Sequence, residues 1–372
     1  MRVQIKGEIH EMLAVDMADH VVTMLDQRWL PFRVEVRQFT SWLDTVNAIK
    51  DLVTRGAGSV GVAGAFAMAQ AGHQVTTTTL EQFQRELAEA ASVIRQARPT
   101  AITLAAAVSY CLNAASEGTT IPDKQARVDQ AAREILANDI RASASLSKIG
   151  AQLLQPESRI LTHCNTGPLA IQDSGSAIGV ISATHNAGKL AMVYISETRP
   201  WFQGSRLTTW ELQQENIPYH LVVDSAAGYL FQKNLVNVVI VGADCIAANG
   251  DVANKIGTYE KAVLAYEHQV PFFVAAPLFA FDLKCSDGAQ IKIEERPGTE
   301  VTTITGRLPS GEISSVQVTP NDTPTLNPVF DVTPARYITG FITEKGVLKG
   351  VSQKKIQKLL DSPLLPSGEK GI

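Results

Sequence analysis

The sequence lacks the long apolar segment of a membrane protein. Its longest apolar stretches are residues 60–69 and the proline-interrupted residues 270–281, and both are well short of the roughly 18 residues that a membrane-spanning helix needs. Residues 1–16 alternate polar and apolar side chains, without the apolar core of a signal peptide. We therefore expect a soluble protein of the cytoplasm that does not bind a membrane.

Cysteine and histidine are scarce and scattered. None of the four cysteines, Cys111, Cys164, Cys245 and Cys285, has the close partner that is typical of a zinc ribbon or a secreted disulfide framework. The seven histidines include no HxH or HxxxH pair. We therefore expect reduced thiols, no resident metal and no cofactor.

The chain also lacks an excess of positive charge. Its 33 Lys and Arg residues against 37 Asp and Glu residues give a net charge of −4, so we expect no nucleic-acid partner. A few local cations would still suffice for a small anionic ligand. With 372 residues, 45% of them apolar, the chain has enough core for one large or two ordinary domains.

The pattern of apolar residues changes twice along the chain. Short alternating runs around residues 3–9, 21–25 and 33–39 predict a small antiparallel sheet. From residue 41 to about residue 155, apolar residues recur at helical spacing, which predicts a helical bundle. After Pro156, short β-rich runs alternate with helical stretches, as in βαβ units with a parallel sheet.

The sequence therefore predicts an α/β protein with two domains. Residues 1–155 would form an amino-terminal domain with the small sheet and the helical bundle, and residues 156–372 a Rossmann-like catalytic domain. Within the second domain, residues 291–325 are rich in Gly, Pro, Thr and Asp and predict an irregular excursion before a final strand at residues 337–343. We expect the tail, residues 362–372, to be mobile.

Polar segments follow three of the predicted strands. They are THCNTG at residues 162–167, ETRPWFQG at residues 197–204 and DCIAANG at residues 244–250. In an open parallel sheet, ligands gather at the carboxyl ends of the strands. We expect these three segments to line one crevice.

Cys164 and Asp244 are the candidates for chemistry in these segments. A cation or a helix N-terminus facing Cys164 would favour its reactive thiolate, while the alternative is a buried, inert thiol. Asp244 follows an apolar run, where burial raises the pKa of a carboxyl toward that of a general acid or base. Its alternative role is to cap the next helix. His163 points to the opposite face of its strand from Cys164 and is interpreted as structural.

Three further segments have residues suited to an anion. Arg55, Gly56 and Ala57 precede a helix of small residues, whose N-terminus would attract an anion; the alternative is close helix packing through Gly and Ala. Arg98 precedes Pro99 at an expected helix start and is either a capping charge or a phosphate ligand. Asn254 and Lys255 together offer an amide and a cation for an oxyanion, although a lone lysine is ordinarily a solvated surface charge.

Several long motifs resemble one known family. LTHCNTGPLA, ETRPWFQGSRLTTWEL, VGADCIAANGDVANKIGTYEKAVLA and NPVFDVTPARYITGFITEKG closely resemble methylthioribose-1-phosphate isomerase, and the resemblance extends from about Val21 to Gly346. The same superfamily contains ribose-1,5-bisphosphate isomerase and the regulatory subunits of translation initiation factor 2B.

The resemblance implies an aldose–ketose isomerase of methionine salvage. Its reaction converts 5-methylthioribose 1-phosphate to 5-methylthioribulose 1-phosphate without a cofactor, in a homodimer whose interface comes mostly from the second domain. The family's catalytic cysteine and aspartate match Cys164 and Asp244. Its substrate contacts match Arg55, Gly56, Ala57, Arg98, Gln203, Asn254 and Lys255.

The sequence departs from the family pattern at three positions. Cys245 stands where the family usually has arginine, Gly58 where proline is common, and Pro168 where alanine is usual. The segments RGAG at residues 55–58 and VVDSAA at residues 222–227 look more like the bisphosphate isomerases. An isomerase of 5-deoxyribose 1-phosphate or ribose 1,5-bisphosphate is therefore the alternative within the enzyme class. The alternative outside it is a translation-factor regulatory subunit, which would have lost the Cys–Asp pair.

Overall fold

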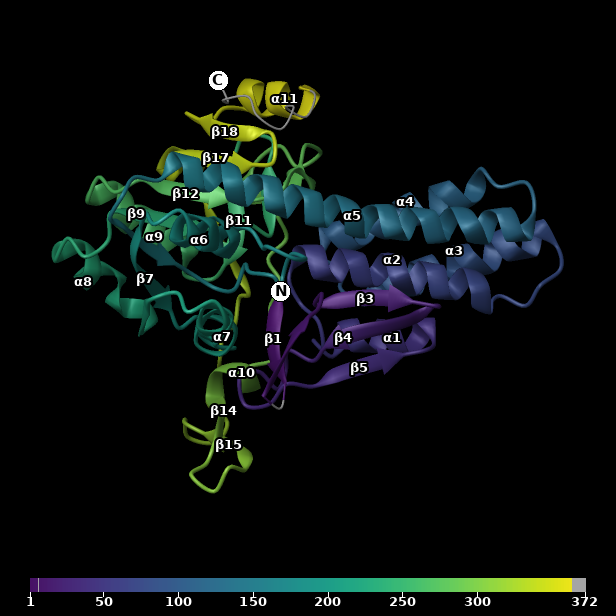
Figure 1. Cartoon of the computed structure of the whole chain (residues 1–372), viewed down its shortest axis with the longest axis horizontal. Helices are drawn as coiled ribbons and strands as arrows, with labels where there is room; N and C mark the ends of the chain where they lie inside the picture. The colour runs from purple at the N-terminus through teal and green to yellow at the C-terminus, as the bar shows by residue number, and fades with distance from the viewer. Residues whose placement is uncertain (6, 363–372) are drawn as a thin grey trace.

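The amino-terminal strands form two small antiparallel sheets. The structure is a computed structural model that describes residues 1–5 and 7–362 (Figure 1). A hairpin and a three-stranded sheet comprise β1 (Arg2–Ile5), β2 (Glu8–Glu11), β3 (Val15–Ala18), β4 (Val21–Leu25) and β5 (Val36–Phe39). The predicted small antiparallel sheet is confirmed, but the run at residues 3–9 is a hairpin rather than one strand, because the chain reverses at Gly7, whose φ is +90°.

The helical bundle is also present as predicted. Its members are α1 (Trp42–Lys50), α2 (Ala57–Gln74), α3 (Leu80–Gln96), α4 (Ile102–Ser116) and α5 (Ile121–Leu153). The side chains of Ser41, Thr79 and Thr120 cap the first turns of α1, α3 and α5. α2 is buried along nearly its whole length, because its many Gly and Ala residues let α4 and α5 pack closely against it. Figure 1 shows the long helix α5 running from the bundle to the large sheet in the second half of the chain.

The second half of the chain is built on a seven-stranded sheet. Its order is β18-β17-β12-β9-β6-β7-β8. The strands are β6 (Ser158–Thr162), β7 (Leu190–Ser196), β8 (Tyr219–Val222), β9 (Val238–Val241), β12 (Phe272–Ala275), β17 (Gly340–Thr343) and β18 (Gly346–Lys349). All neighbours pair in parallel except β17 and β18. The predicted parallel sheet is therefore confirmed.

Helices cover both faces of this sheet. The end of α5, with α6 (Ala177–Asn186) and α7 (Thr209–Gln214), packs on Ile160 and its neighbours, while α8 (Ala227–Gln232) and α9 (Thr258–Glu267) pack on the face that includes Leu161. Because successive strand residues point to opposite faces, a strand covered on both sides must be apolar at every position. This explains the continuous apolar runs in the sequence.

A four-stranded sheet adjoins the end of the large sheet. It has the order β13-β10-β11-β16 and consists of β10 (Cys245–Ala247), β11 (Val252–Lys255), β13 (Phe281–Asp282) and β16 (Phe330–Thr333). The predicted irregular excursion at residues 291–325 is wrong in part. It contains the short helix α10 (Thr299–Thr302) and a hairpin of β14 (Thr303–Arg307) and β15 (Ile313–Gln317), which projects from the body in Figure 1.

Two predicted element boundaries were wrong, and the predicted tail lies almost wholly outside the described residues. The final strand begins at Gly340, because residues 335–337 form a 3-10 turn after Pro334, and β18 and the helix α11 (Gln353–Asp361) follow it. Pro99 lies in a turn, and α4 starts only at Ile102. Of the tail at residues 362–372, only Ser362 is among the described residues. The domain boundary between residues 155 and 156 stays a prediction.

No helix among the described residues combines the length and apolar character that crossing a membrane requires.

Candidate active site

The sheet order places Cys164 and Asp244 side by side. From β6 the chain moves outward through β7 to β8, then returns to β9 on the other side of β6. Ligand crevices of open α/β sheets lie at such a reversal, outside the carboxyl ends of the two central strands. Cys164 follows β6 by two residues, and Asp244 follows β9 by three.

A cavity of about 120 Å³ lies at this point. All the predicted site residues line it, namely Arg55, Gly56, Ala57, Arg98, Cys164, Gln203, Asp244, Asn254 and Lys255. The structure therefore brings together residues from both halves of the chain that are far apart in sequence. Their roles in binding and catalysis remain predictions.

The backbone of Cys164 is held in an unusual conformation. Its φ is +66°, in the left-handed region that L-residues seldom adopt. Its N–H donates to Oγ1 of Thr198 at 3.0 Å, and its carbonyl oxygen accepts from Oγ1 of Thr208 at 2.7 Å. Thr208 closes a π-helical turn, Gly204–Thr208, directly after Gln203. These contacts offset the strain and fix the thiol at the cavity wall.

Burial opposes the predicted thiolate of Cys164. The thiol is only 8% exposed, and this burial raises its pKa above the ordinary value, although the positive charges of Arg55 and Lys255 act in the opposite direction. The cations expected around the thiol are therefore present. Because burial outweighs them, the protonated thiol is the main form at neutral pH.

Asp244 is half-buried at the cavity wall. Burial raises the pKa of its carboxyl, with opposing contributions from Lys255, Arg55 and Arg98, so the predicted direction is confirmed. Its N–H donates to the carbonyl of Ala253 at 3.0 Å, and the next element is strand β10. The alternative of a helix cap is therefore wrong.

Arg55 is positioned through Asn165 and Glu211. Nη2 of Arg55 donates to the Asn165 carbonyl oxygen at 2.9 Å and to Oδ1 at 2.7 Å. The Asn165 amide donates in turn to Oγ1 of Thr208 and to the Glu211 carboxyl. Burial raises the pKa of Glu211 to about 7. Glu211 was not identified from the sequence, because an acidic residue in a helical run is ordinarily exposed.

Lys255 is buried rather than solvated. It ends strand β11, and its Nζ donates to the carbonyl of Val329 at 2.9 Å and lies 5.0 Å from the ring centre of Phe330. Burial lowers the pKa of Lys255, while Cys164 and Asp244 act in the opposite direction. The adjacent Asn254 amide donates to Oγ1 of Thr258 at 3.0 Å.

A second group of cations comes from the predicted excursion. Lys292 and Arg296 line the cavity together with Arg98. Glu294 holds two of them, with its carboxyl 3.7 Å from Nη2 of Arg98 and 3.1 Å from Nε of Arg296. Sequence reasoning missed Lys292 and Arg296, although they lie in the motif IKIEER at residues 291–296. The available signal was the charge of this segment, in which four of the six residues, Lys292, Glu294, Glu295 and Arg296, are charged.

Gly56 immediately precedes α2 and has a conformation that requires glycine. Its φ is +91°, and a Cβ atom at this position would overlap the backbone and Cβ of Ala170. This close approach brings the N-terminus of α2, the positive end of the helix dipole, to the cavity.

We expect Gly56→Ala to lower the free energy of unfolding by about 2 kcal/mol or more, because both the positive φ and the overlap with Ala170 must be relieved. The measurement is urea denaturation followed by circular dichroism. Gly72→Ala is the matched control, since a Cβ there meets nothing within 4 Å inside the same helix and should stabilise by about 0.5–1 kcal/mol. Equal stabilities of the two variants would contradict this reading.

His163 lies outside the cavity wall. Nε2 of its buried ring is 2.8 Å from the carbonyl of Ile256, and burial lowers the pKa of His163 to about 3. The ring is therefore neutral at physiological pH, which fits the structural interpretation.

Several polar atoms around the cavity have no protein partner in the described part of the chain. Arg55 Nε, Thr166 Oγ1, Ser176 Oγ and Gln203 Oε1 are buried without a hydrogen bond. Buried polar atoms are normally paired. The cavity wall also contains five cations, Arg55, Arg98, Lys255, Lys292 and Arg296, against the single carboxyl of Asp244. The arrangement suits a polar, anionic ligand.

Comparison with known proteins places the chain in a family. Residues 53–350 match the initiation factor 2 subunit family. The methylthioribose-1-phosphate isomerase of Trichlorobacter lovleyi is 43% identical over 338 residues, which cover 90% of this chain and 95% of that protein. That of Acetivibrio thermocellus is 40% identical over 349 residues, covering 93% and 99%. The chain belongs to the methylthioribose-1-phosphate isomerases of this family.

Solved structures of the initiation factor 2 subunit family share the fold. A 5-methylthioribose 1-phosphate isomerase from Pyrococcus horikoshii is 36% identical with a TM-score of 0.84, and the match covers 94% of this chain and 96% of the other. Subunit delta of translation initiation factor eIF-2B from A. fulgidus is 34% identical with a TM-score of 0.80, covering 95% and 100%. The family resemblance and the α/β fold expected from the sequence are both confirmed.

Proposed function

We propose that this chain is an aldose–ketose isomerase that converts 5-methylthioribose 1-phosphate to 5-methylthioribulose 1-phosphate in methionine salvage. The supporting observation is that Cys164 and Asp244 line one cavity, beside adjacent parallel strands, among five cations. The similarity to named isomerases along nearly the whole chain supports the same substrate. The reaction needs no cofactor, because its proton transfers can be performed by the side chains present.

Asp244 acts on the oxygen atoms of the sugar. Because the C1 oxygen is phosphorylated, the ring cannot open by simple loss of a proton. Asp244 donates its proton to the ring oxygen as the bond between that oxygen and C1 breaks, and later accepts the proton of the C2 hydroxyl. Burial raises the pKa of Asp244, which makes its protonated form more accessible than that of an exposed aspartate, as a general acid requires.

Cys164 transfers the carbon-bound hydrogen. Because the resting Cys164 is a thiol, its proton first passes to the Asp244 carboxylate. The thiolate so formed removes the C2 hydrogen as a proton, and as thiol it returns that proton to C1. The positive charges of Arg55 and Lys255 stabilise the transient thiolate, and Lys255 and Arg55 also hold negative oxygen atoms of the intermediate. Both residues end the cycle in their starting protonation states.

The substrate's two ends need different surroundings. Arg98 and the N-terminus of α2 are suited to the C1 phosphate. Apolar side chains elsewhere in the wall, including Val60, Ile102 and Trp201, suit the methylthio group, which has no hydrogen-bond donors.

Ribose 1,5-bisphosphate is the second candidate substrate. The observation that favours it is the additional pair Lys292 and Arg296, because a second phosphate would require further positive charge. The C5 methyl group of 5-deoxyribose 1-phosphate would need only the apolar wall.

Steady-state kinetics with the three sugar phosphates test the substrate. We expect kcat/KM for 5-methylthioribose 1-phosphate to exceed kcat/KM for 5-deoxyribose 1-phosphate by about 10-fold or more, because the missing methylthio group removes apolar contacts. It should exceed kcat/KM for the bisphosphate by about 100-fold. A preference for the bisphosphate would replace the named substrate and leave the isomerase chemistry intact.

A regulatory subunit of translation initiation factor 2B is the non-enzymatic alternative. A binding module of that kind would have no use for the thiol–carboxyl pair among buried cations. Failure to isomerise all three sugar phosphates, together with binding of nucleotide or of a factor complex, would establish it.

We also propose that the enzyme is a homodimer in the cytoplasm. Exposed apolar side chains on the second half of the chain, such as Val223, Tyr229 and Tyr266, suit a subunit interface. The four free cysteines suit a reducing compartment. Sedimentation equilibrium of the purified chain measures the subunit number.

A further inference from the structure

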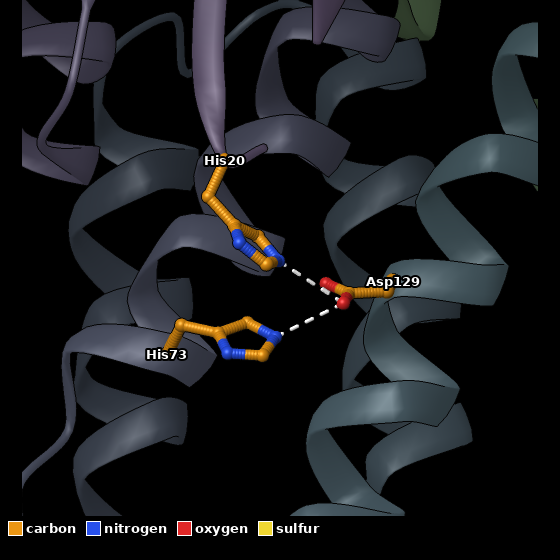
Figure 2. Close-up of side chains that lie close together, drawn as sticks. All are labelled: His20, His73 and Asp129. Atoms are coloured by element: carbon orange, nitrogen blue, oxygen red, sulfur yellow. Dashed lines mark hydrogen bonds and ion pairs between the residues drawn. The ribbon is translucent and has the colours of Figure 1, made fainter. Parts of the chain in front are cut away.

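Two histidines and an aspartate lie close together in the helical bundle. None of the three lines the active-site cavity. His20 lies in the turn between β3 and β4, His73 in the last turn of α2, and Asp129 on α5. Figure 2 shows both imidazole rings pointing at the same carboxyl group. Among the described residues, this is where three His, Cys, Asp or Glu ligand atoms lie within 4.8 Å of one another.

The distances suit ligands of one metal ion. Nε2 of His20 and Nε2 of His73 lie 3.1 and 3.0 Å from the same atom, Oδ2 of Asp129. Metal–ligand bonds of about 2.0–2.1 Å in a tetrahedron separate neighbouring ligand atoms by about 3.3 Å. The two ring centres lie 3.8 Å apart with the ring planes tilted by 38°, and both Nε2 atoms face Oδ2 of Asp129. A small movement would therefore admit an ion between the three atoms.

We propose that His20, His73 and Asp129 bind a divalent transition-metal ion, with Zn²⁺ as the ion that best fits two imidazoles and one carboxylate. The fourth position is left to water. The ion would be a structural link, because it joins the β3–β4 turn to two helices that are distant in sequence.

The surroundings support a preformed site. The Gln70 amide donates to the carbonyl of His20 at 2.9 Å, and the Gln125 amide donates to the carbonyl of Gly72, beside His73, at 3.0 Å. These bonds hold the backbone of both histidines on the bundle. His20 itself has a φ of +59°, so the turn directs its ring in a conformation that the protein must maintain.

The site is accessible to an ion from solvent. The side chains of His20 and His73 are 36% and 33% exposed, while that of Asp129 is 19% exposed. Oδ1 of Asp129 is buried without a hydrogen-bond partner in the described chain, and is therefore free to complete the coordination of an ion at Oδ2. The metal-free alternative is a clamp in which both imidazoles donate Nε2–H to Oδ2.

Isothermal titration with Zn²⁺ separates the two possibilities. The untagged full-length chain is stripped with a chelator, dialysed and titrated with ZnCl₂, and its thermal unfolding is followed with and without the ion. We expect one Zn²⁺ per chain and a Tm increase of about 3 °C or more at a concentration 100-fold above Kd. Cobalt replacement should give the visible absorption of a tetrahedral Co²⁺ site.

Variants locate the bound ion. Asp129→Asn and His73→Ala should each weaken binding by about 10-fold or more and remove the Tm increase. His10→Ala is the matched control, because His10 is an exposed histidine on β2, and it should bind as the unchanged chain does. Sugar-phosphate isomerisation checks that each variant is folded, since none of these residues lines the cavity.

The proposal is overturned if the chain binds no Zn²⁺, or if Asp129→Asn and His73→Ala bind it as tightly as the unchanged chain. The second result would place the ion on other groups, such as the thiols, and would leave the three residues as a hydrogen-bonded clamp only. Neither result affects the proposed isomerase activity.

Discussion

Asp244→Asn is expected to lower kcat by about 10²–10⁴-fold, the contribution of a general acid–base group. Asparagine keeps the size of the side chain but can neither donate a proton to the ring oxygen nor accept one from the C2 hydroxyl.

The pH dependence of kcat/KM should also change. In the unchanged enzyme, kcat/KM should fall at acid pH, where the group of lower pKa becomes protonated, and at alkaline pH, where the group of higher pKa loses its proton. Asp244, raised from 3.8, has the lower pKa, and Cys164, raised from 9.0, the higher. In the proposed reacting form the proton is on Asp244 and Cys164 is a thiolate, so the variant keeps only the requirement for the thiolate. Its kcat/KM should therefore rise with pH toward the raised pKa of Cys164 and lose the alkaline limb.

Stability distinguishes lost chemistry from lost folding in this variant. A carboxyl whose pKa is higher in the folded than in the unfolded state destabilises the folded protein at every pH above the unfolded value. Neutralising Asp244 should therefore leave the free energy of unfolding at pH 7 unchanged or raise it. An Asp244→Asn enzyme of normal stability and nearly normal kcat would remove Asp244 from the mechanism.

Cys164→Ser is expected to lower kcat by about 10³-fold or more, because a serine hydroxyl is a far weaker acid than a thiol and does not form the required base. The measurement is the rate of isomerisation at saturating substrate, together with the isotopic composition of the product formed in D₂O. Proton transfer through Cys164 predicts solvent deuterium at C1 of the product of the unchanged enzyme. Complete retention of a C2 deuterium label would instead establish a direct hydride shift.

Cys285→Ser is the matched control for Cys164→Ser. Cys285 is a buried free thiol that contacts the carbonyl of Asp287 at 3.2 Å and does not line the cavity. It should retain kcat within about twofold. Equal losses in the two variants would indicate a general sensitivity of the fold to thiol replacement rather than a reaction at Cys164.

The sequence was most informative where one physical rule determines the outcome. Strands covered on both faces must be apolar throughout, so β9 and β12 were recognisable as runs of apolar residues. The carboxyl ends of such strands collect ligands, which led to Cys164 and Asp244. The positions of Gly56 and Ala57 followed from the rule that a helix N-terminus attracts anions.

Features that depend on distant contacts could not be predicted in the same way. Nothing local marks Glu211 as buried, because its burial depends on Asn165 and Leu169 from the loop after β6. The direction in which the pKa of Cys164 shifts could not be predicted from local sequence either, since it depends on how completely the surrounding chain excludes water from the thiol. The His20, His73 and Asp129 group escaped the search for paired histidines because its members are far apart in sequence.

Cys164 and Asp244 follow the paired strands β6 and β9, whereas the walls suited to the rest of the substrate come from other elements. Ile160 and Leu161 lie opposite Val238 and Val239 in this pair, and neighbouring strands are about 4.8 Å apart whatever their side chains. Backbone pairing therefore brings together the two strand ends that carry Cys164 and Asp244, and the side chains of Thr198 and Thr208 then hold Cys164 in place. The remaining walls come from α2, from β11 and from the segment that contains Arg296. Changes in those walls can redirect the enzyme to another sugar phosphate during evolution while the proposed pair, Cys164 and Asp244, stays in place.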